Sequence, residues 1–158
     1  MNARAPRGFA LIELLISVAI LGVLAGGAMT FADLARQRSD EQELRTSLRE
    51  IRQAIDAYKR ASDDKRIARA ADETGYPRSL SELSDGVTDS ASPKAVKIYF
   101  LRRLPRDPLA DPALPAQETW GLRSYASGPD DPQPGRDVYD VYSKSPRKGL
   151  DGQPYGAW

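Results

Sequence analysis

Carboxylates are the main candidates for chemistry in this chain, because its 158 residues include no cysteine and no histidine. That composition excludes a thiolate nucleophile, an imidazole base and the usual zinc sites. Glu118, Asp130 and Asp131 are the acids that could act as a pair in glycoside chemistry. They stand among turn-forming residues, and adjacent aspartates are typical of a loop. We therefore expect no enzyme, and an enzyme or binding protein remains a distant alternative.

The overall charge also limits the possible partners. Lys and Arg number 23 against 22 Asp and Glu, a formal net charge of +1. This balance is unlike that of nucleic-acid-binding proteins, so no nucleic acid is expected as a partner.

The residue types are sharply segregated along the chain. Residues 1–8 are short and basic, with Arg4 and Arg7, whereas residues 9–32 are apolar except for Glu13, Ser17 and Thr30. The apolar stretch is long enough to cross a bilayer of about 30 Å as a helix. From Asp33 onward the sequence is polar. The pattern predicts a leader at 1–8 and a transmembrane helix at 9–32.

One long helix is expected to continue beyond the apolar stretch. No proline occurs between Pro6 and Pro77. The apolar residues of the second half follow one helical stripe: Leu44, Leu48, Ile51, Ile55 and Tyr58. A single helix over residues 9–61 would be roughly 80 Å long, and it must pack against a membrane, partners, or both.

The remaining residues predict a loop-rich domain. Residues 79–83 are compatible with a short helix, and residues 95–103 leave helix and strand open. Residues 120–127 and 137–143 predict two strands, joined by the turn-forming sequence GPDDPQPG. We expect an α+β fold: a long N-terminal helix packed on a small antiparallel β domain. The predicted divisions are 1–8, 9–32, an amphipathic helix at 33–62 and a globular domain at 63–158.

Glu13 distinguishes the apolar stretch from two common kinds of segment. A secretory signal peptide is one, since Ala25 and Gly27 fit a small-x-small cleavage rule; a plain single-span anchor is the other. An acid in hydrocarbon costs about 2.5–3.5 kcal/mol on insertion scales for the comparable Asp. Neither kind of segment gains from that cost, so a partner charge for Glu13 is indicated.

The sequence from Gly8 to Leu15, GFALIELL, resembles the class III signal of type IV pilins and pseudopilins. The resemblance implies that a prepilin peptidase cleaves between Gly8 and Phe9 and N-methylates Phe9. It also implies that Glu13 compensates the Phe9 amine of a neighbouring subunit during assembly. Removing one partner of such a buried pair typically costs about 3–5 kcal/mol.

Glycines in the same segment suggest a further role. Gly22 and Gly26 have the GxxxG spacing, and Gly27 follows. Such glycines let helices pack closely in a membrane. They also loosen a helix, since each costs about 1 kcal/mol relative to alanine. The two interpretations are compatible and both stay open.

Later segments are most similar to the G-type major pseudopilin of type II secretion. They are Tyr76-Pro77, the run LRRLPRDP at 101–108, residues 120–127 and the ending at 152–158. The resemblance implies a homo-oligomeric pseudopilus that drives protein export across the outer membrane. The implied partners are other pseudopilins, the prepilin peptidase and the inner-membrane secretion platform.

The same resemblance implies a bacterial inner-membrane protein with a single span and its C-terminal domain in the periplasm. A minor pseudopilin and a type IV or DNA-uptake pilus subunit are the alternatives. A membrane-anchored periplasmic enzyme or binding protein is the distant alternative.

Calcium is the one cofactor that the resemblance suggests, in the last loop of the fold. The acids in that region are Asp137, Asp140 and Asp151, and hard cations bind several such oxygens. Basic residues, Lys144, Arg147 and Lys148, occupy a loop that is usually acidic and glycine-rich in the family. Solvated turn acids are therefore the competing interpretation.

Overall fold

A computed structural model describes the backbone of residues 9–158 and the side chains of residues 11–23 and 31–158. The predicted leader, with Gly8, lies outside the described residues. Nothing is described of the side chain of Phe9 or of the helix positions of Gly26 and Gly27 beyond their backbone. The chain divides into two compact units, Met1–Ser39 and Asp40–Trp158.

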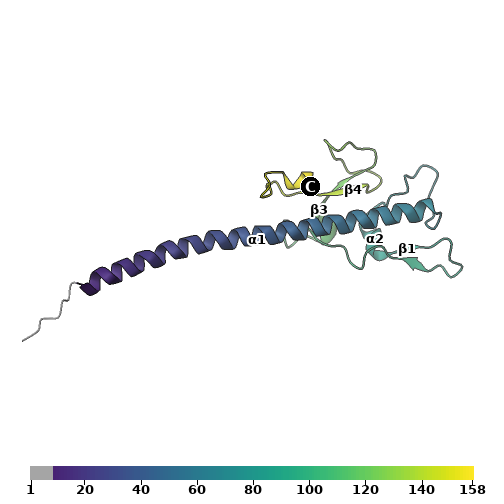
Figure 1. Ribbon diagram of the computed structural model, residues 1–158. Coiled ribbons are helices and arrows are strands. Elements are labelled where there is room, and N and C mark those ends of the chain that lie inside the picture. Colours follow the sequence, from purple (N-terminus) through teal and green to yellow (C-terminus); the bar gives the residue numbers. More distant parts are fainter. Residues whose placement is uncertain (1–8) are drawn as a thin grey trace, which may run out of the picture. The chain divides into compact units, whose positions relative to one another are not determined.

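The predicted long helix is confirmed as α1, Phe9–Asp63 (Figure 1). It ends where the sequence loses its helical pattern. Asp64 N–H still bonds the Arg60 oxygen at 2.9 Å, and Lys65 then takes a positive φ of 60°. A helix of this length is possible because the first proline after Pro6 is Pro77.

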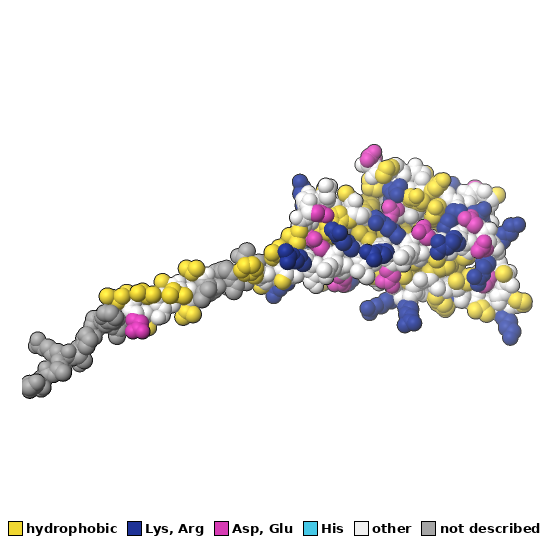
Figure 2. Space-filling model, viewed as in Figure 1, with side chains coloured by type: hydrophobic (Ala, Val, Ile, Leu, Met, Phe, Trp, Pro, Cys, Tyr) yellow, Lys and Arg dark blue, Asp and Glu magenta, His cyan; other side chains and the backbone are white. Residues whose placement is uncertain are grey.

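In the first unit, the described side chains of α1 are almost all exposed. Leu11, Ile12, Leu15, Leu21 and Val23 are each 60% exposed or more. Figure 2 shows hydrophobic side chains gathered along this part of the helix. Among the residues described, no helix combines the length and hydropathy required for crossing a membrane. The predicted segment 9–32 includes undescribed side chains at 24–30 and stays a prediction.

The second unit combines the end of α1 with short elements and two small antiparallel sheets. The helices are α2 (Ser81–Asp85), α3 (Ala116–Thr119) and the 3-10 helix η1 (Tyr155–Ala157). The strands are β1 (Val87–Thr88), β2 (Lys97–Ile98), β3 (Trp120–Arg123) and β4 (Asp140–Ser143). β1 pairs with β2, and β3 pairs with β4 in the register Trp120↔Ser143. The predicted α+β class is confirmed.

Both predicted strands near the carboxyl end are shorter than expected. β3 ends at Arg123 because Ser124 N–H bonds the oxygen of Gln133 and begins a turn closed by Ser127. β4 begins only at Asp140, since Val138 N–H bonds the Pro77 oxygen across the domain at 2.7 Å. Side-chain and loop contacts at these positions replace the ladder that the residue pattern predicted.

The predicted apolar stripe of α1 forms one side of the hydrophobic core. Leu44, Ile51 and Ile55 are 1% exposed or less. The residues packed in the same cluster come from the loops, α2, both strands of the second sheet and η1: Leu80, Leu83, Leu101, Trp120, Val138, Val141 and Tyr155. Helical spacing therefore predicts which face of α1 holds the domain.

The LRRLPRDP run has a structural role in this core. The Trp120 indole N–H donates to the Pro105 oxygen at 2.9 Å. Asp107 is 1% exposed, and it accepts from the Ser143 hydroxyl at 2.6 Å and from Leu109 N–H at 2.8 Å. The run is thereby joined to both strands of the second sheet.

Candidate functional site

The candidate assembly site is the described part of α1 in the first unit. Glu13 is exposed, and its carboxylate has no hydrogen bond or ion pair among the described residues. Its main-chain oxygen accepts from the Ser17 hydroxyl at 2.8 Å, an ordinary i,i+4 contact. The carboxylate is thus surrounded by exposed apolar side chains of the same helix. It is available to a charge that another molecule would bring.

Gly22 gives this helix an open position. A Cβ built there would meet nothing within 4 Å, so the single chain supplies no neighbour that requires a glycine. A packing role for Gly22 would depend on a second helix. The structure leaves both interpretations of the glycines open.

The carboxyl-terminal acids proposed for calcium are not brought together. Asp137 accepts from the Thr74 hydroxyl and from Tyr125 N–H. Asp140 pairs with Arg52 at 2.7 Å and Arg123 at 3.1 Å, and Asp151 pairs with Arg45 at 3.2 Å. Within the described residues no group of three such ligands could hold a metal ion. Since hydrogen-bond donors of the chain occupy these oxygens, the three acids do not fit a calcium site.

Arginines of α1 hold the end of the chain to the helix. Arg52 donates to Asp140, to the Val141 oxygen at 3.1 Å and to the Trp158 oxygen at 2.7 Å. The Arg45 guanidinium lies 4.0 Å from the centre of the Trp158 ring. Sequence reasoning missed this arrangement, because both residues look like ordinary exposed helix arginines and their partners lie about a hundred positions away.

Glu41 extends the same contact. It is only 8% exposed and accepts from Leu150 N–H at 2.8 Å and from the Tyr155 hydroxyl at 2.9 Å. An acid nine residues after the apolar stretch would be expected in solvent. The signal that could have found it is its place three residues before Leu44, on the same helical face.

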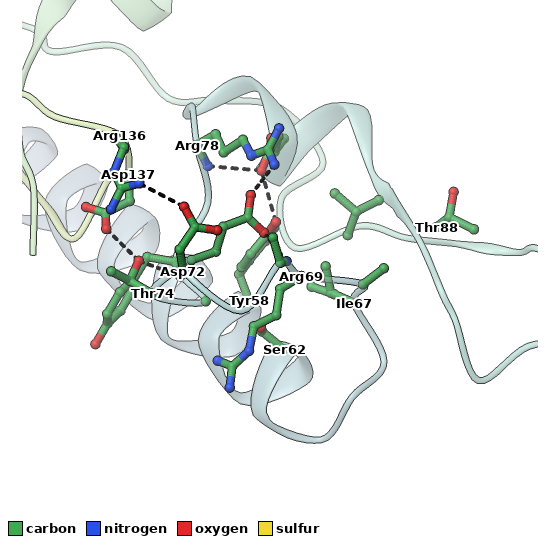
Figure 3. A pocket seen from close by; sticks show the side chains of 17 residues that line it. Tyr58, Ser62, Ile67, Arg69, Asp72, Thr74, Arg78, Thr88, Arg136 and Asp137 are labelled. Carbon is green, nitrogen blue, oxygen red and sulfur yellow. Dashed lines mark hydrogen bonds and ion pairs between the residues drawn. The ribbon is translucent and has the colours of Figure 1, made fainter.

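A cavity of 730 Å³ lies between the end of α1, α2, β1 and the loops at 67–78 and 136–137 (Figure 3). The charges around it are compensated in pairs. Arg136 contacts Asp72 at 3.1 Å, and Arg78 contacts Glu73. Hydrogen bonds from Arg78 and from Ala70 N–H lower the pKa of Glu73. This carboxyl group therefore stays ionised and paired, as a structural anion would, and not as a proton donor near neutral pH.

The cavity also contains Tyr58, whose hydroxyl donates to Glu82 at 3.0 Å. Burial, with the nearby Glu82 carboxylate, raises the pKa of Tyr58. The three acids considered for glycoside chemistry do not line this cavity. Glu118, Asp130 and Asp131 are exposed instead, and Asp131 accepts from the Gln133 amide at 2.7 Å. The distant catalytic alternative gains no support from their placement.

The long amino-terminal helix and the small antiparallel sheets are consistent with a pilin fold. Residues 3–29 match the family described as "Prokaryotic N-terminal methylation motif".

About two thirds of the chain is similar to proteins named "Type II secretion system core protein G". The relative from Klebsiella michiganensis is 26% identical over 112 residues, 68% of this chain and 71% of that protein. The relative from Aeromonas hydrophila is 26% identical over 116 residues, 71% of this chain and 73% of that protein. The relative from Klebsiella pneumoniae is 28% identical over 106 residues, 65% and 68% of the two chains. No solved structure matches the chain significantly. The predicted resemblance to G-type pseudopilins is confirmed.

Proposed function

We propose that this chain is a structural subunit of a type II secretion pseudopilus, which assembles through α1 and supports protein export across the outer membrane. The observation that carries this is an apolar, largely exposed helix surface around Glu13, within the matched methylation motif. An exposed surface of this kind requires a cover, because apolar area in water is unfavourable. In the proposed cycle a membrane covers it in the stored subunit and neighbouring helices cover it in the filament.

Processing is the first proposed step. A prepilin peptidase would cleave between Gly8 and Phe9 and methylate Phe9, leaving the apolar segment in the mature chain. Loss of Arg4 and Arg7 changes the count of basic residues from 23 to 21, against 22 acidic ones. The mature chain would stay in the inner membrane with its globular domain in the periplasm. The match of residues 3–29 supports this step.

Assembly is the second proposed step, and it depends on Glu13. The Glu13 carboxylate would pair with the Phe9 amine of a neighbouring subunit, so that each charge compensates the other in hydrocarbon. Such a pair sets the register between subunits, because a shifted neighbour leaves each charge uncompensated. Gly22, Gly26 and Gly27 would serve close packing or loosening of the helix at the same stage. The proposed partners are further copies, other pseudopilins and the inner-membrane secretion platform, with a minor pseudopilin or a pilus subunit as the alternative role.

The experiment compares Glu13→Ala with Asp130→Ala, an exposed loop acid away from α1 without an ion pair among the described residues. Each full-length variant is produced together with the secretion machinery. Mass spectrometry of the mature amino terminus reports processing, and sedimentation of sheared filaments reports assembly. We expect methylated Phe9 in both variants, normal filaments from Asp130→Ala and few from Glu13→Ala. Wild-type filament yield from Glu13→Ala would contradict the assembly role, and processing near Ala28 would favour ordinary secretion.

A second comparison separates the subunit from a membrane-anchored enzyme or binding protein. Residues 9–32 are replaced by an unrelated single-span anchor. A pseudopilin should lose assembly and secretion, whereas an anchored enzyme would keep its activity. Retained secretion with the foreign anchor would contradict the proposed function.

A further inference from the structure

A basic segment follows β4 and has no role in the proposed assembly step. Residues 144–150 contain no acid and three cations, Lys144, Arg147 and Lys148, all of them exposed. Lys144 donates to the Glu118 oxygen at 3.0 Å. The side chains of Arg147 and Lys148 have no hydrogen bond or ion pair in the part of the chain that is described.

The backbone that carries these cations is ordered as a small hairpin. Lys148 forms an antiparallel bridge with Pro154, and Gly149 N–H bonds the Gln153 oxygen at 2.8 Å. Gly152, with a φ of 81°, closes the turn by donating to the Gly149 oxygen at 2.9 Å. We refer to residues 144–153 as the basic hairpin. Its charges are displayed on a fixed backbone rather than on a disordered tail.

The tip of the basic hairpin rests on the beginning of the second unit's part of α1. Leu150 N–H bonds Glu41, and Asp151 pairs with Arg45. Glu41 is the first buried residue of α1 among those described, so the hairpin meets the helix at the start of the packed domain. Figure 1 shows this yellow carboxyl-terminal segment beside α1.

Glu41 is also close along the chain to the proposed membrane segment. From residue 32 to Glu41 a helix rises about 13 Å. The headgroup layer extends roughly 5–8 Å beyond the hydrocarbon, and charges interact over a Debye length of about 8 Å at physiological salt. Along the helix, the residue that binds the hairpin tip is therefore about as far from the end of the proposed span as these charges act.

We infer that the basic hairpin binds anionic phospholipid headgroups while the subunit is stored in the membrane. This inference rests on the proposed membrane anchor. The Arg147 guanidinium matches a phosphate in a two-point contact, and Lys148 supplies a second positive charge. Leu150 is 46% exposed beside them and would enter the interface between headgroups and acyl chains.

The acids near the hairpin do not cancel this charge. Glu41 is buried and accepts two hydrogen bonds, and Asp151 is paired with Arg45. Glu118 contacts Lys144 through its main-chain oxygen, and no carboxylate of the described residues pairs with Lys144, Arg147 or Lys148. Arg147 and Lys148 thus remain for a partner with phosphate groups.

The test uses the absence of native cysteine, which makes a single labelled position unique. Full-length Leu150→Cys carries a fluorophore in nanodiscs whose headgroups bear a quencher, in phosphatidylcholine alone or with 30% phosphatidylglycerol. Asp64→Cys is the control position, exposed and beyond the carboxyl end of α1. We expect anionic lipid to increase quenching at position 150 at least twofold and to leave position 64 unchanged.

Charge variants complete the test in the Leu150→Cys background. Arg147→Glu with Lys148→Glu should abolish the twofold increase. Lys94→Glu with Arg103→Glu makes the same change in net charge at exposed positions elsewhere and should keep it. Equal quenching in both lipids, or no effect of the hairpin variant, would overturn the inference. Quenching that follows the number of copies per nanodisc instead of lipid charge would also overturn it and would indicate an acidic surface of a second copy. Chains that stay in the nanodisc in every case keep the proposed anchor intact, whereas loss from the nanodisc contradicts both.

Discussion

Loss of the half-buried Arg52 side chain should weaken the packed domain. Its side chain makes three contacts that join α1 to β4 and to the chain end: an ion pair with Asp140 and hydrogen bonds to the Val141 and Trp158 oxygens. Asp140 would keep Arg123 after Arg52→Ala, so its charge stays compensated. The two main-chain oxygens would lose a donor of the protein.

The magnitude follows from the exposure of the pair. Side-chain exposures of 38% and 26% reduce the ion pair to about 0.5–1 kcal/mol. Each hydrogen bond from the guanidinium to a half-buried main-chain oxygen adds about 1 kcal/mol net. Arg52→Ala should therefore lower the free energy of unfolding by about 2.5–3 kcal/mol. For a unit of this size that corresponds to a decrease in Tm of about 10 °C.

The assay is guanidinium unfolding of the full-length chain in detergent, followed by tryptophan fluorescence. Both tryptophans, Trp120 and Trp158, lie in the second unit, so the signal reports that unit. Arg52→Lys should fall between wild type and Arg52→Ala, because an ammonium cannot reproduce the planar fork. Arg49→Ala, an exposed arginine on the same helix with no partner in the described chain, should change stability by less than about 0.5 kcal/mol. A loss below that value for Arg52→Ala would refute the reasoning.

Three further predictions concern pH, packing and metal. The hydrogen bond from Arg66 lowers the pKa of Asp89 in the folded chain. The ion pair therefore stabilises the fold above the unfolded pKa of about 3.9, and this stabilisation is lost as pH falls through the lower folded pKa. Asp89→Asn should reduce the free energy of unfolding at pH 7 and make it fall less steeply in acid, and parallel curves of unfolding free energy against pH for the variant and wild type would contradict this. Gly121→Ala places a Cβ 2.3 Å from the Tyr142 ring and should lower the free energy of unfolding by about 1–3 kcal/mol. Gly128→Ala, whose Cβ would meet nothing within 4 Å, should leave stability nearly unchanged. Equal denaturation midpoints for the two variants would be inconsistent with the packing of β3 on β4. Thermal unfolding should be the same in EDTA and in millimolar calcium, and a rise in Tm with calcium would show that the three carboxyl-terminal aspartates can rearrange around an ion.

The helical part of the fold could be predicted because its signal is local. The stripe from Leu44 to Tyr58 repeats with helical spacing, and every member is buried. The sheet could be predicted only in outline, because pairing of β3 with β4 depends on contacts between distant residues. Asp107, for example, looks like a turn acid, yet it is fully buried and bonds Ser143, 36 positions later. The environments of charged residues were the least predictable from sequence. Glu41 and Arg52, for example, bind residues 150–158, which are about a hundred positions away.

The surface of α1 in the second unit is divided between two tasks, and its charges follow that division. The face with Leu48 and Ile51 is buried in the domain, whereas Glu43, Arg49 and Glu50 are exposed and have no ion pair in the described structure. Exposed charges contribute little to the stability of a single chain, because water and salt screen them. They become important when another molecule excludes that water, as the packing of neighbouring helices would in a filament. A helix that holds its own domain with one apolar stripe can therefore keep the opposite face for its neighbours, so that changes on that face affect assembly without unfolding the subunit.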